Sequence, residues 1–299
     1  FLLLFEWRTD NMIDIKYNGD RIMISGEYID IKAVFDCGQF FRYFPDDECD
    51  YIIARDKLLF VKNTDEALEI YPSSREEFES FWYPFLRLDM SYLDTETEFL
   101  RDDVLKKTVP VCRGMRILHQ DEFETLISFI ISANNNIKRI KKIIESICAA
   151  AGEKRQVGKK LYYSFPTPQT LSRLTEAQLL ECGAGYRAPY IAKTANAVKD
   201  GFDLNCIYDM SYVSAKKHLC TLMGVGPKVA DCILLFSYNK FEAFPVDTWV
   251  KKILKDYYAF EPKTNDEAVR FAIDKFGGNA GIAQQYLFHY IRTQSSLQK

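Results

Sequence analysis

The stretch KKHLCTLMGVGPKVADCILLFSYNKFEAFPVDTWVKKIL, residues 216–254, decides how the second half of the chain folds. It predicts a helix that ends near Met223, a tight hairpin through Gly224 and Gly226, and a second helix from Pro227, a residue suited to the first helical position. The glycines let backbone amides approach a phosphate closely, and the start of the following helix adds partial positive charge. The stretch therefore predicts a sequence-independent grip on a phosphate. Carbonyl oxygens of the same hairpin could hold a monovalent cation.

Lys228 stands in the first turn of the second predicted helix. There it faces the positive end of the helix dipole, which disfavours the charged form of an amine. A neutral lysine amine can attack an electrophilic sugar carbon and form a Schiff base. The alternative interpretation is a solvated lysine that contacts a phosphate.

Asp247 follows Phe244-Pro245-Val246 and precedes the helical pattern TWVKKILKDYY. We expect it to be the N-cap of that helix, an arrangement worth about 1 kcal/mol. A carboxylate held rigidly at a helix start can also face positive charge that develops on a sugar ring. The two roles are compatible.

The overall charge of the 299-residue chain is −3, which by itself argues against a protein that binds a polyanion. Residues 1–110, however, hold 13 Lys and Arg against 24 Asp and Glu, a net charge of −11, whereas residues 111–299 hold 26 against 18, a net charge of +8. Residues 138–160 alone carry eight basic side chains. The second part can therefore attract nucleic acid despite the acidic total.

Composition excludes several classes of protein. Apolar residues make up 47% and aromatic residues 14%, too many for a mainly disordered chain, and no run approaches the roughly 18 apolar residues of a membrane-spanning helix. The eight cysteines, at positions 37, 49, 112, 148, 182, 206, 220 and 232, show no C-x-x-C spacing. We expect reduced cytosolic thiols without a zinc site or iron–sulfur cluster. The opening FLLLFEWRTDN, residues 1–11, does not resemble a signal peptide, and we assign it no function.

The first third of the chain has the alternation of strands. Asn18-Gly19 is a strong hairpin signal, and residues 51–62 predict a second strand–turn–strand unit of a twisted antiparallel sheet that ends near Ser74. From Arg75 onward the period is helical, and residues 122–148 predict two helices with a break at residues 134–136. Further helices are expected at residues 168–182, 187–200, 211–222, 227–238, 248–258, 264–276 and 280–293. The predicted fold is α+β, with a β domain and trailing helix at residues 12–110 and a helical domain at residues 111–299 that contains the helix–hairpin–helix at about 213–238.

The order of helix, G-V-G-x-K hairpin, V-A-D-C and P-V-D resembles the helix-hairpin-helix superfamily of DNA glycosylases, and further details resemble the 8-oxoguanine DNA glycosylase family from about Cys37 to Phe288. The resemblance implies two helical subdomains beside the sheet, with DNA in the cleft between them. It implies a monomer that removes 8-oxoguanine opposite cytosine from duplex DNA and cuts the strand by β-elimination. No cofactor is required, membranes are not a partner, and the expected location is the cytoplasm or nucleoid, or the nucleus in a eukaryote.

The resemblance also implies roles for individual residues. Lys228 would displace the base from C1′, and Asp247 would stabilise the oxocarbenium-like state. The carbonyl of Gly38, in CGQFFRY, would accept the N7 hydrogen that 8-oxoguanine has and guanine lacks, and a side chain at Gly38 would block that approach. Cys232 and Phe288 would sandwich the flipped base, and Gln284 would read its Watson–Crick edge. Without the resemblance, Gly38 is interpreted as a loop glycine and Cys232 and Phe288 as core residues.

The remaining implied contacts concern the DNA around the lesion. Asn134, in SANNNIKRI, would fill the hole that the flipped base leaves, and Arg139, Tyr186 and Arg187 would contact the estranged cytosine. Gly224 and Gly226 would approach the DNA backbone, while the carbonyls of Cys220, Leu222 and Val225 match a cation position. Trp249 stands where the family usually has a histidine near a phosphate, which puts that contact in doubt.

Two other hypotheses remain. One is a helix-hairpin-helix glycosylase for another damaged base, although Lys228 disfavours alkyl-base enzymes and the absence of cysteines after Cys232 disfavours enzymes with a four-cysteine cluster. The other is a non-catalytic module that binds DNA only through its backbone. Such a module does not need a lysine and an aspartate at this spacing.

Overall fold

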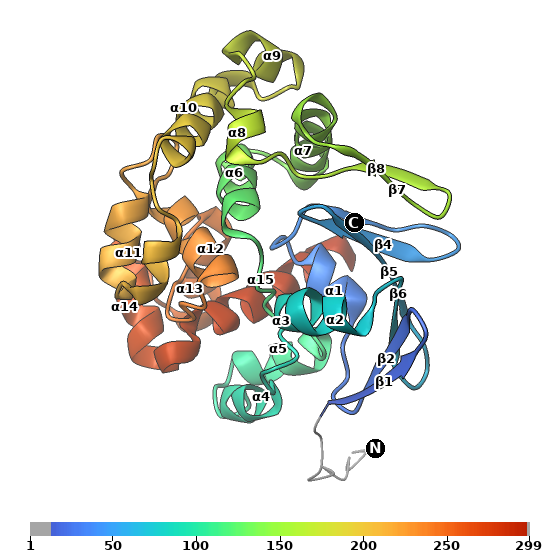
Figure 1. Ribbon diagram of the computed structural model, residues 1–299. Coiled ribbons are helices and arrows are strands. Elements are labelled where there is room, and N and C mark those ends of the chain that lie inside the picture. Colours follow the sequence, from blue (N-terminus) through green and yellow to red (C-terminus); the bar gives the residue numbers. More distant parts are fainter. Residues whose placement is uncertain (1–12, 298–299) are drawn as a thin grey trace.

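The N-terminal part forms a six-stranded antiparallel sheet in a computed structural model that describes residues 13–297 (Figure 1). The strand order is β1-β2-β6-β5-β4-β3. The strands are β1 (Asp14–Asn18), β2 (Arg21–Ser25), β3 (Tyr43–Phe44), β4 (Asp50–Ala54), β5 (Lys57–Asn63) and β6 (Leu68–Tyr71). Both predicted hairpins are confirmed, because β1 pairs with β2 around Gly19 and β4 pairs with β5. Our assignment of no function to residues 1–11 lies outside the described residues.

A short helix interrupts the strands and covers the sheet. Helix α1 (Ile31–Asp36) was not expected from the strand-like pattern, and it begins where the side chain of Asp30 accepts the Ala33 amide. Its apolar residues join those of the strands and of the segment at residues 78–88 in one core. This packing holds α1 against the sheet and so fixes where the residues after it begin.

Most of the remaining chain is helical, as predicted. The elements up to the break at residues 134–136 are α2 (Arg75–Glu77), η1 (Phe78–Trp82), α3 (Tyr83–Phe85), α4 (Leu93–Phe99), α5 (Leu105–Cys112) and α6 (Glu122–Ser132). After it come α7 (Ile137–Ala151), α8 (Pro168–Leu171), α9 (Glu176–Glu181), η2 (Gly185–Arg187), α10 (Ala188–Lys199), η3 (Asn205–Asp209), α11 (Tyr212–Leu219), α12 (Pro227–Ser237), α13 (Thr248–Tyr258), α14 (Asn265–Phe276), η4 (Gly277–Asn279) and α15 (Ala280–Leu297). The break at residues 134–136 is confirmed, and the side chain of Asn136 caps α7.

Two sequence predictions in this part were wrong in detail. The single helix expected at residues 168–182 is two short helices, because Thr175 and Gln178 form a capping box that starts α9. Residues 154–163 form the hairpin β7 (Lys154–Val157) and β8 (Lys160–Tyr163), which a helical period did not suggest. Its polar strands lack apolar alternation, and Tyr162 attaches the hairpin to Ile53 of the large sheet.

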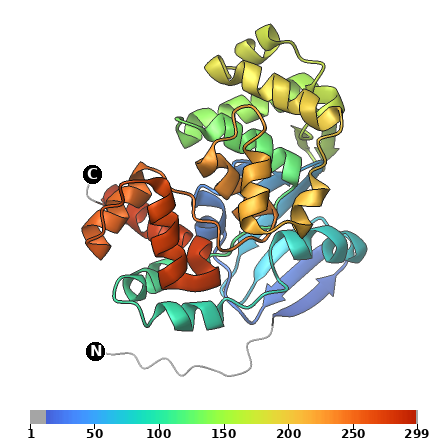
Figure 2. The same cartoon turned by 90° about the vertical axis from the view of Figure 1, so that its left-hand side faces the viewer.

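Helix α12, the second helix of the helix–hairpin–helix motif, lies among the other helices of the C-terminal part. Figure 1 shows the sheet on the right, α7 to α10 at the top and α11 to α14 on the left. In Figure 2, which is turned by 90°, α7 to α10 are again at the top. Helix α12 packs against α6 and α11, and α15 packs against α5, α13 and α14. The helical core also takes in Ala33, Cys37 and Phe41 from the N-terminal part. The division into domains at residue 110 stays a prediction.

None of the helices within residues 13–297 combines the length and apolar character needed to cross a bilayer.

Candidate active site

The predicted helix–hairpin–helix is confirmed, and its two glycines differ. Gly224 has φ +84°, and a Cβ there would lie 2.7 Å from Cβ of Tyr190, so both backbone conformation and close packing require glycine. Gly226 precedes α12 with φ −89°, and a Cβ there would meet nothing within 4 Å. Gly224 therefore shapes the hairpin, while Gly226 lies beside open space at the start of α12.

Lys228, Cys232 and Asp247 converge at the start of α12. Cys232 lies one turn after Lys228 and is only 3% exposed. Burial raises the pKa of its thiol to about 11, while the charge and a hydrogen bond of Lys228 oppose this rise and the carboxylate of Asp247 adds to it. The Lys228 ammonium also lies 5.5 Å from the ring centroid of Phe129. A half-buried amine is thus held between an aromatic ring and a thiol that stays protonated near neutral pH.

Asp247 is the N-cap of α13, as predicted. Its Oδ1 accepts the Val250 amide at 2.8 Å. The preceding Phe244 and Val246 are buried, which anchors the loop that leads to the carboxylate. Trp249, in the first turn of α13, is 42% exposed.

Gly38 lies directly after α1 and meets residues from both ends of the helical part. A Cβ at Gly38 would lie 3.6 Å from Cε1 of Phe288 on α15 and 4.0 Å from Cδ1 of Ile137 on α7. These are ordinary van der Waals distances, so the structure has room for a methyl group at this position. The expectation that a side chain here would block the approach of the base to the carbonyl stays a prediction. Gly38 has φ +88°, and this left-handed conformation is what favours glycine.

Gln284 lies one turn before Phe288 on α15 and is 4% exposed. Its Oε1 accepts a hydrogen bond from Nε2 of Gln285 at 2.7 Å. Phe288 itself is half-buried. The structure therefore brings Gly38 and Phe288 together although 250 positions separate them in the chain.

Asn134 is exposed between α6 and α7, with φ +49°. Arg187 lies beneath it, only 2% exposed, and its guanidinium donates to the carbonyl oxygens of Ala133 (2.9 Å from Nε) and Asn134 (2.8 Å from Nη2). The Tyr186 hydroxyl donates to the Ala133 carbonyl at 3.1 Å, and its side chain is 54% exposed. Sequence reasoning missed that Arg187 supports the loop from inside, and no local pattern marks this role. Contact of these residues and of the exposed Arg139 with an opposite base stays a prediction.

The hairpin carbonyls fit a monovalent cation in kind, since oxygen is the ligand such ions take. The Leu222 carbonyl already accepts the Val225 amide at 3.2 Å, and its second lone pair remains for a cation. Cys220 caps the end of α11, and Val225 is buried in the turn. In the part of the chain that the structure describes, no group of three or more His, Cys, Asp or Glu side chains is arranged around a metal position. The cation stays a prediction.

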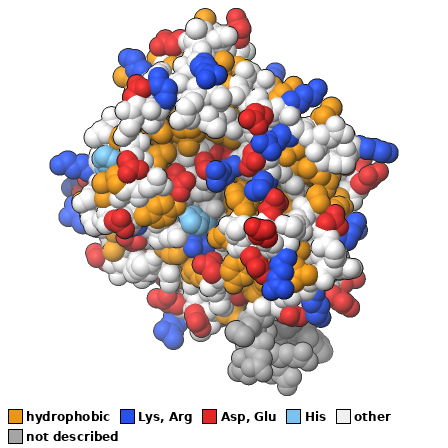
Figure 3. Space-filling view, in the orientation of Figure 1, with side chains coloured by type: hydrophobic (Ala, Val, Ile, Leu, Met, Phe, Trp, Pro, Cys, Tyr) orange, Lys and Arg blue, Asp and Glu red, His pale blue; other side chains and the backbone are white. Residues whose placement is uncertain are grey.

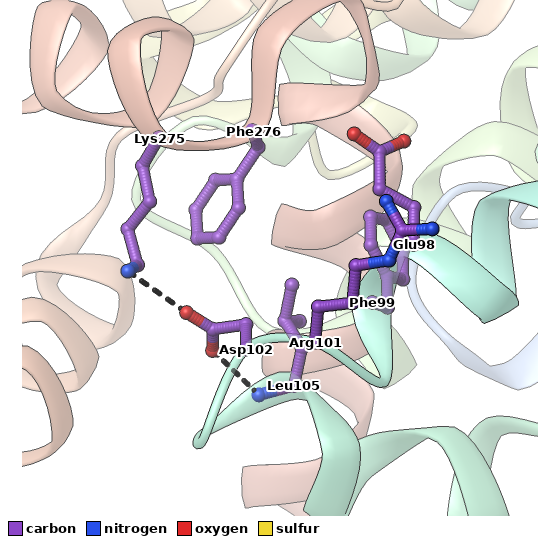
Figure 4. A pocket seen from close by; sticks show the side chains of 7 residues that line it. All are labelled: Glu98, Phe99, Arg101, Asp102, Leu105, Lys275 and Phe276. Atoms are coloured by element: carbon purple, nitrogen blue, oxygen red, sulfur yellow. Dashed lines mark hydrogen bonds and ion pairs between the residues drawn. The ribbon is translucent and has the colours of Figure 1, made fainter.

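A cavity of about 280 Å³ between α4–α5 and α14 contains none of the predicted site residues (Figure 4). Asp102 crosses it to pair with Lys275 at 2.8 Å and accepts the Leu105 amide at 2.9 Å. Burial raises the pKa of Asp102, but these bonds outweigh burial and lower it overall. Asp102 and Lys275, which both line this cavity, therefore pair with each other.

The surface carries charged side chains of both signs (Figure 3). On the face that Figure 3 shows, Lys and Arg side chains are interspersed with Asp and Glu. The positive excess of residues 111–299 is therefore not gathered into one patch on this face.

Comparisons with known proteins agree with this architecture. Residues 21–126 match the N-terminal domain of 8-oxoguanine DNA glycosylase, and residues 127–277 match the HhH-GPD superfamily of base excision DNA repair proteins. The N-glycosylase/DNA lyase of Saccharomyces cerevisiae is 32% identical over 84% of this chain and 74% of its own. The probable N-glycosylase/DNA lyase of Methanothermobacter thermautotrophicus is 35% identical over 67% of this chain and 71% of its own.

Solved structures agree as well. The Clostridium acetobutylicum 8-oxoguanine glycosylase/lyase, in complex with double-stranded DNA containing cytosine opposite 8-oxoG, superposes with a TM-score of 0.90 at 41% identity, covering 95% of this chain and 98% of that one. Its apo form gives a TM-score of 0.88 at 42% identity, covering 93% and 98%. The resemblance inferred from the hairpin motif is confirmed: the chain belongs to the 8-oxoguanine DNA glycosylase/lyase family of the HhH-GPD superfamily.

Proposed function

We propose that the protein removes 8-oxoguanine from duplex DNA with cytosine opposite and then cleaves the strand at the abasic site. The observation that carries this proposal is the convergence of Lys228, Cys232 and Asp247 at the start of α12. The names of the relatives support it, since the yeast relative is an N-glycosylase/DNA lyase and the clostridial structure holds DNA with cytosine opposite 8-oxoG.

DNA binding begins at the hairpin. A Cβ at Gly226 would meet nothing within 4 Å, so a phosphate has room to approach the start of α12, and the amides there bind it without reading the sequence. The target nucleotide must leave the stack, at a cost of a few kcal/mol, before an amine can reach its C1′ carbon. Asn134, exposed on its supported loop, enters the space that the base vacates, and the exposed Tyr186 and Arg139 face the unpaired cytosine.

The pocket then selects the base. The Gly38 carbonyl accepts the N7 hydrogen of 8-oxoguanine and repels the bare N7 acceptor of guanine. Phe288 stacks on one face of the base, and Cys232, whose thiol is neutral because burial raises its pKa to about 11, covers the other. Gln284 offers both a donor and an acceptor to the Watson–Crick edge.

Base removal and strand cleavage share one lysine. Once its amine has given up a proton, Lys228 forms a bond to C1′ while the bond from C1′ to the base nitrogen breaks, and the base leaves with the electron pair and takes up a proton. The capped carboxylate of Asp247 stabilises the positive charge that develops on the sugar. The sugar ring then opens to a protonated imine, a proton leaves C2′, and the C3′–oxygen bond breaks with its electrons going to the phosphate. Water hydrolyses the imine and frees Lys228.

The protein acts without a required cofactor and as a monomer, and it works where DNA is found, in the cytoplasm or nucleoid, or in the nucleus of a eukaryote. The hairpin carbonyls of Cys220, Leu222 and Val225 would hold a monovalent cation that neutralises part of the phosphate charge. This cation would contribute to DNA binding and not to the chemical steps.

Borohydride trapping tests the chemistry. Reduction of the imine should join the intact protein covalently to a duplex containing 8-oxoguanine opposite cytosine, and Lys228→Gln should abolish the adduct. Lys251→Gln, exposed on α13, is the matched control and should trap as the wild type does. Absence of an adduct in the wild type would refute the Schiff base, and a full adduct with Lys228→Gln would place the nucleophile elsewhere.

A further inference from the structure

We propose that Arg292 is a positioning residue for lesion recognition, because it holds the Gly38 carbonyl in register with the Phe288 ring. This inference rests on the proposed function, in which Gly38 and Phe288 together recognise the flipped base.

Arg292 touches both halves of the proposed base pocket from α15. Its Nη1 donates to the carbonyl of Asp36, the last residue of α1, at 3.1 Å. Its guanidinium carbon lies 5.5 Å from the ring centroid of Phe288, about one turn earlier on α15. A Cβ at Gly38 would lie only 3.5 Å from the same Nη1. One planar group therefore contacts the end of α1 and the stacking ring, and it lies beside the recognition glycine.

The chemistry of these contacts suits arginine. The last carbonyls of a helix have no partner within the helix, and a cation at this end interacts favourably with the helix dipole. A guanidinium can also lie over an aromatic face while its fork donates in the plane, which a lysine ammonium does less well. Arg292 thus satisfies the end of α1 and orients the Phe288 ring at the same time.

The consequence concerns discrimination between two similar bases. Gly38 follows a helix that packs on the sheet, whereas Phe288 lies near the C-terminal end of the chain. A base stacked on Phe288 meets the Gly38 carbonyl only if the two elements keep their relative position. Hydrogen-bond selection of N7–H over bare N7 depends on that geometry, and a misplacement of about 1 Å can cost a factor of about 100 in rate. Arg292 links the two elements at this point through its hydrogen bond to the Asp36 carbonyl.

The test separates excision from strand cleavage. Arg292→Met should lower the single-turnover release of 8-oxoguanine opposite cytosine roughly ten- to a hundredfold. Cleavage of the same duplex with a preformed abasic site has no base to position, so its rate should stay within about twofold of the wild type. Arg292→Lys should recover part of the excision rate, because an ammonium can still donate to the Asp36 carbonyl. Arg270→Met, exposed on α14, is the matched control and should change neither rate.

A second readout needs no activity. Amide hydrogen exchange of the peptide covering residues 36–40 should be faster in Arg292→Met than in the wild type, because the end of α1 loses its external partner. Equal losses of excision and abasic-site cleavage would overturn the proposal, as would unchanged excision or unchanged exchange. An Arg292→Lys variant no better than Arg292→Met would also overturn the role of the Asp36 contact. Wild-type protein that releases no 8-oxoguanine would refute the proposed function instead, while the exchange measurement would still decide whether Arg292 holds α1.

Discussion

Replacing each hairpin glycine with alanine should separate folding from DNA binding. Gly224→Ala should mainly destabilise the protein, and Gly226→Ala should mainly weaken its affinity for DNA. The two residues lie in the same turn, so each variant is the control for the other.

The magnitude for Gly224 has two parts. An alanine forced to φ +84° costs about 1–2 kcal/mol in backbone strain. Its methyl group would also lie 2.7 Å from Cβ of Tyr190 on α10, a packed backbone-proximal atom that cannot rotate away, and such overpacking costs about 1–3 kcal/mol. We therefore expect Gly224→Ala to lower the free energy of unfolding by about 2–5 kcal/mol.

Alanine at Gly226 would cause neither backbone strain nor overpacking. Its φ of −89° is open to any residue, and its Cβ would meet nothing within 4 Å, so only the poorer N-cap preference of alanine remains, about 1 kcal/mol or less. The added methyl group would, however, stand in the open space where a phosphate approaches the amides of α12. The affinity for DNA should fall about tenfold, the equivalent of one charge-assisted hydrogen bond.

Two assays measure these effects. Urea unfolding gives the loss of stability, and fluorescence anisotropy at a fixed salt concentration gives the affinity for a duplex with an uncleavable abasic-site analogue. Equal losses of stability in the two variants would refute the structural distinction between the glycines. Unchanged affinity in a folded Gly226→Ala protein would refute the phosphate grip.

Two further predictions concern buried charges. Burial raises the pKa of Asp231 on α12 to about 6, although Lys216 and Tyr212 oppose the rise. The folded protein therefore retains a proton that the unfolded chain releases, and the free energy of unfolding should fall as the pH increases from about 4 to 6. Urea titrations across that range should show a smaller fall for Asp231→Asn. A slope unchanged by the substitution would contradict this assignment. Arg187→Met should release the loop at residues 133–134 and speed amide hydrogen exchange there. Arg139→Met, on the exposed side of α7, is the control and should leave the exchange rate unchanged. Equal protection of the loop in both variants would show that Arg187 does not support it.

Features written in neighbouring residues were predictable from the sequence. Gly224, Pro227 and the Asp247 cap specify turns and helix starts through their own backbone preferences, so the hairpin motif and its lysine could be located directly. The hairpins β1–β2 and β4–β5 followed from local alternation in the same way. The hairpin β7–β8 was missed because its strands are mostly polar and gain their order from contact with a distant sheet.

Local residue patterns therefore predicted the secondary structure around the nucleophile and, through the motifs, the family. The pairing of distant residues depends on how the whole chain packs: Gly38 lies beside Phe288 and Arg292, and Arg187 binds the carbonyls of Ala133 and Asn134. The burial of Arg187 was also not evident from the sequence, because no local pattern marks it. The physical reason is range, because backbone preferences and caps act within a few residues, whereas these contacts arise from the packing of helices that are far apart in the chain.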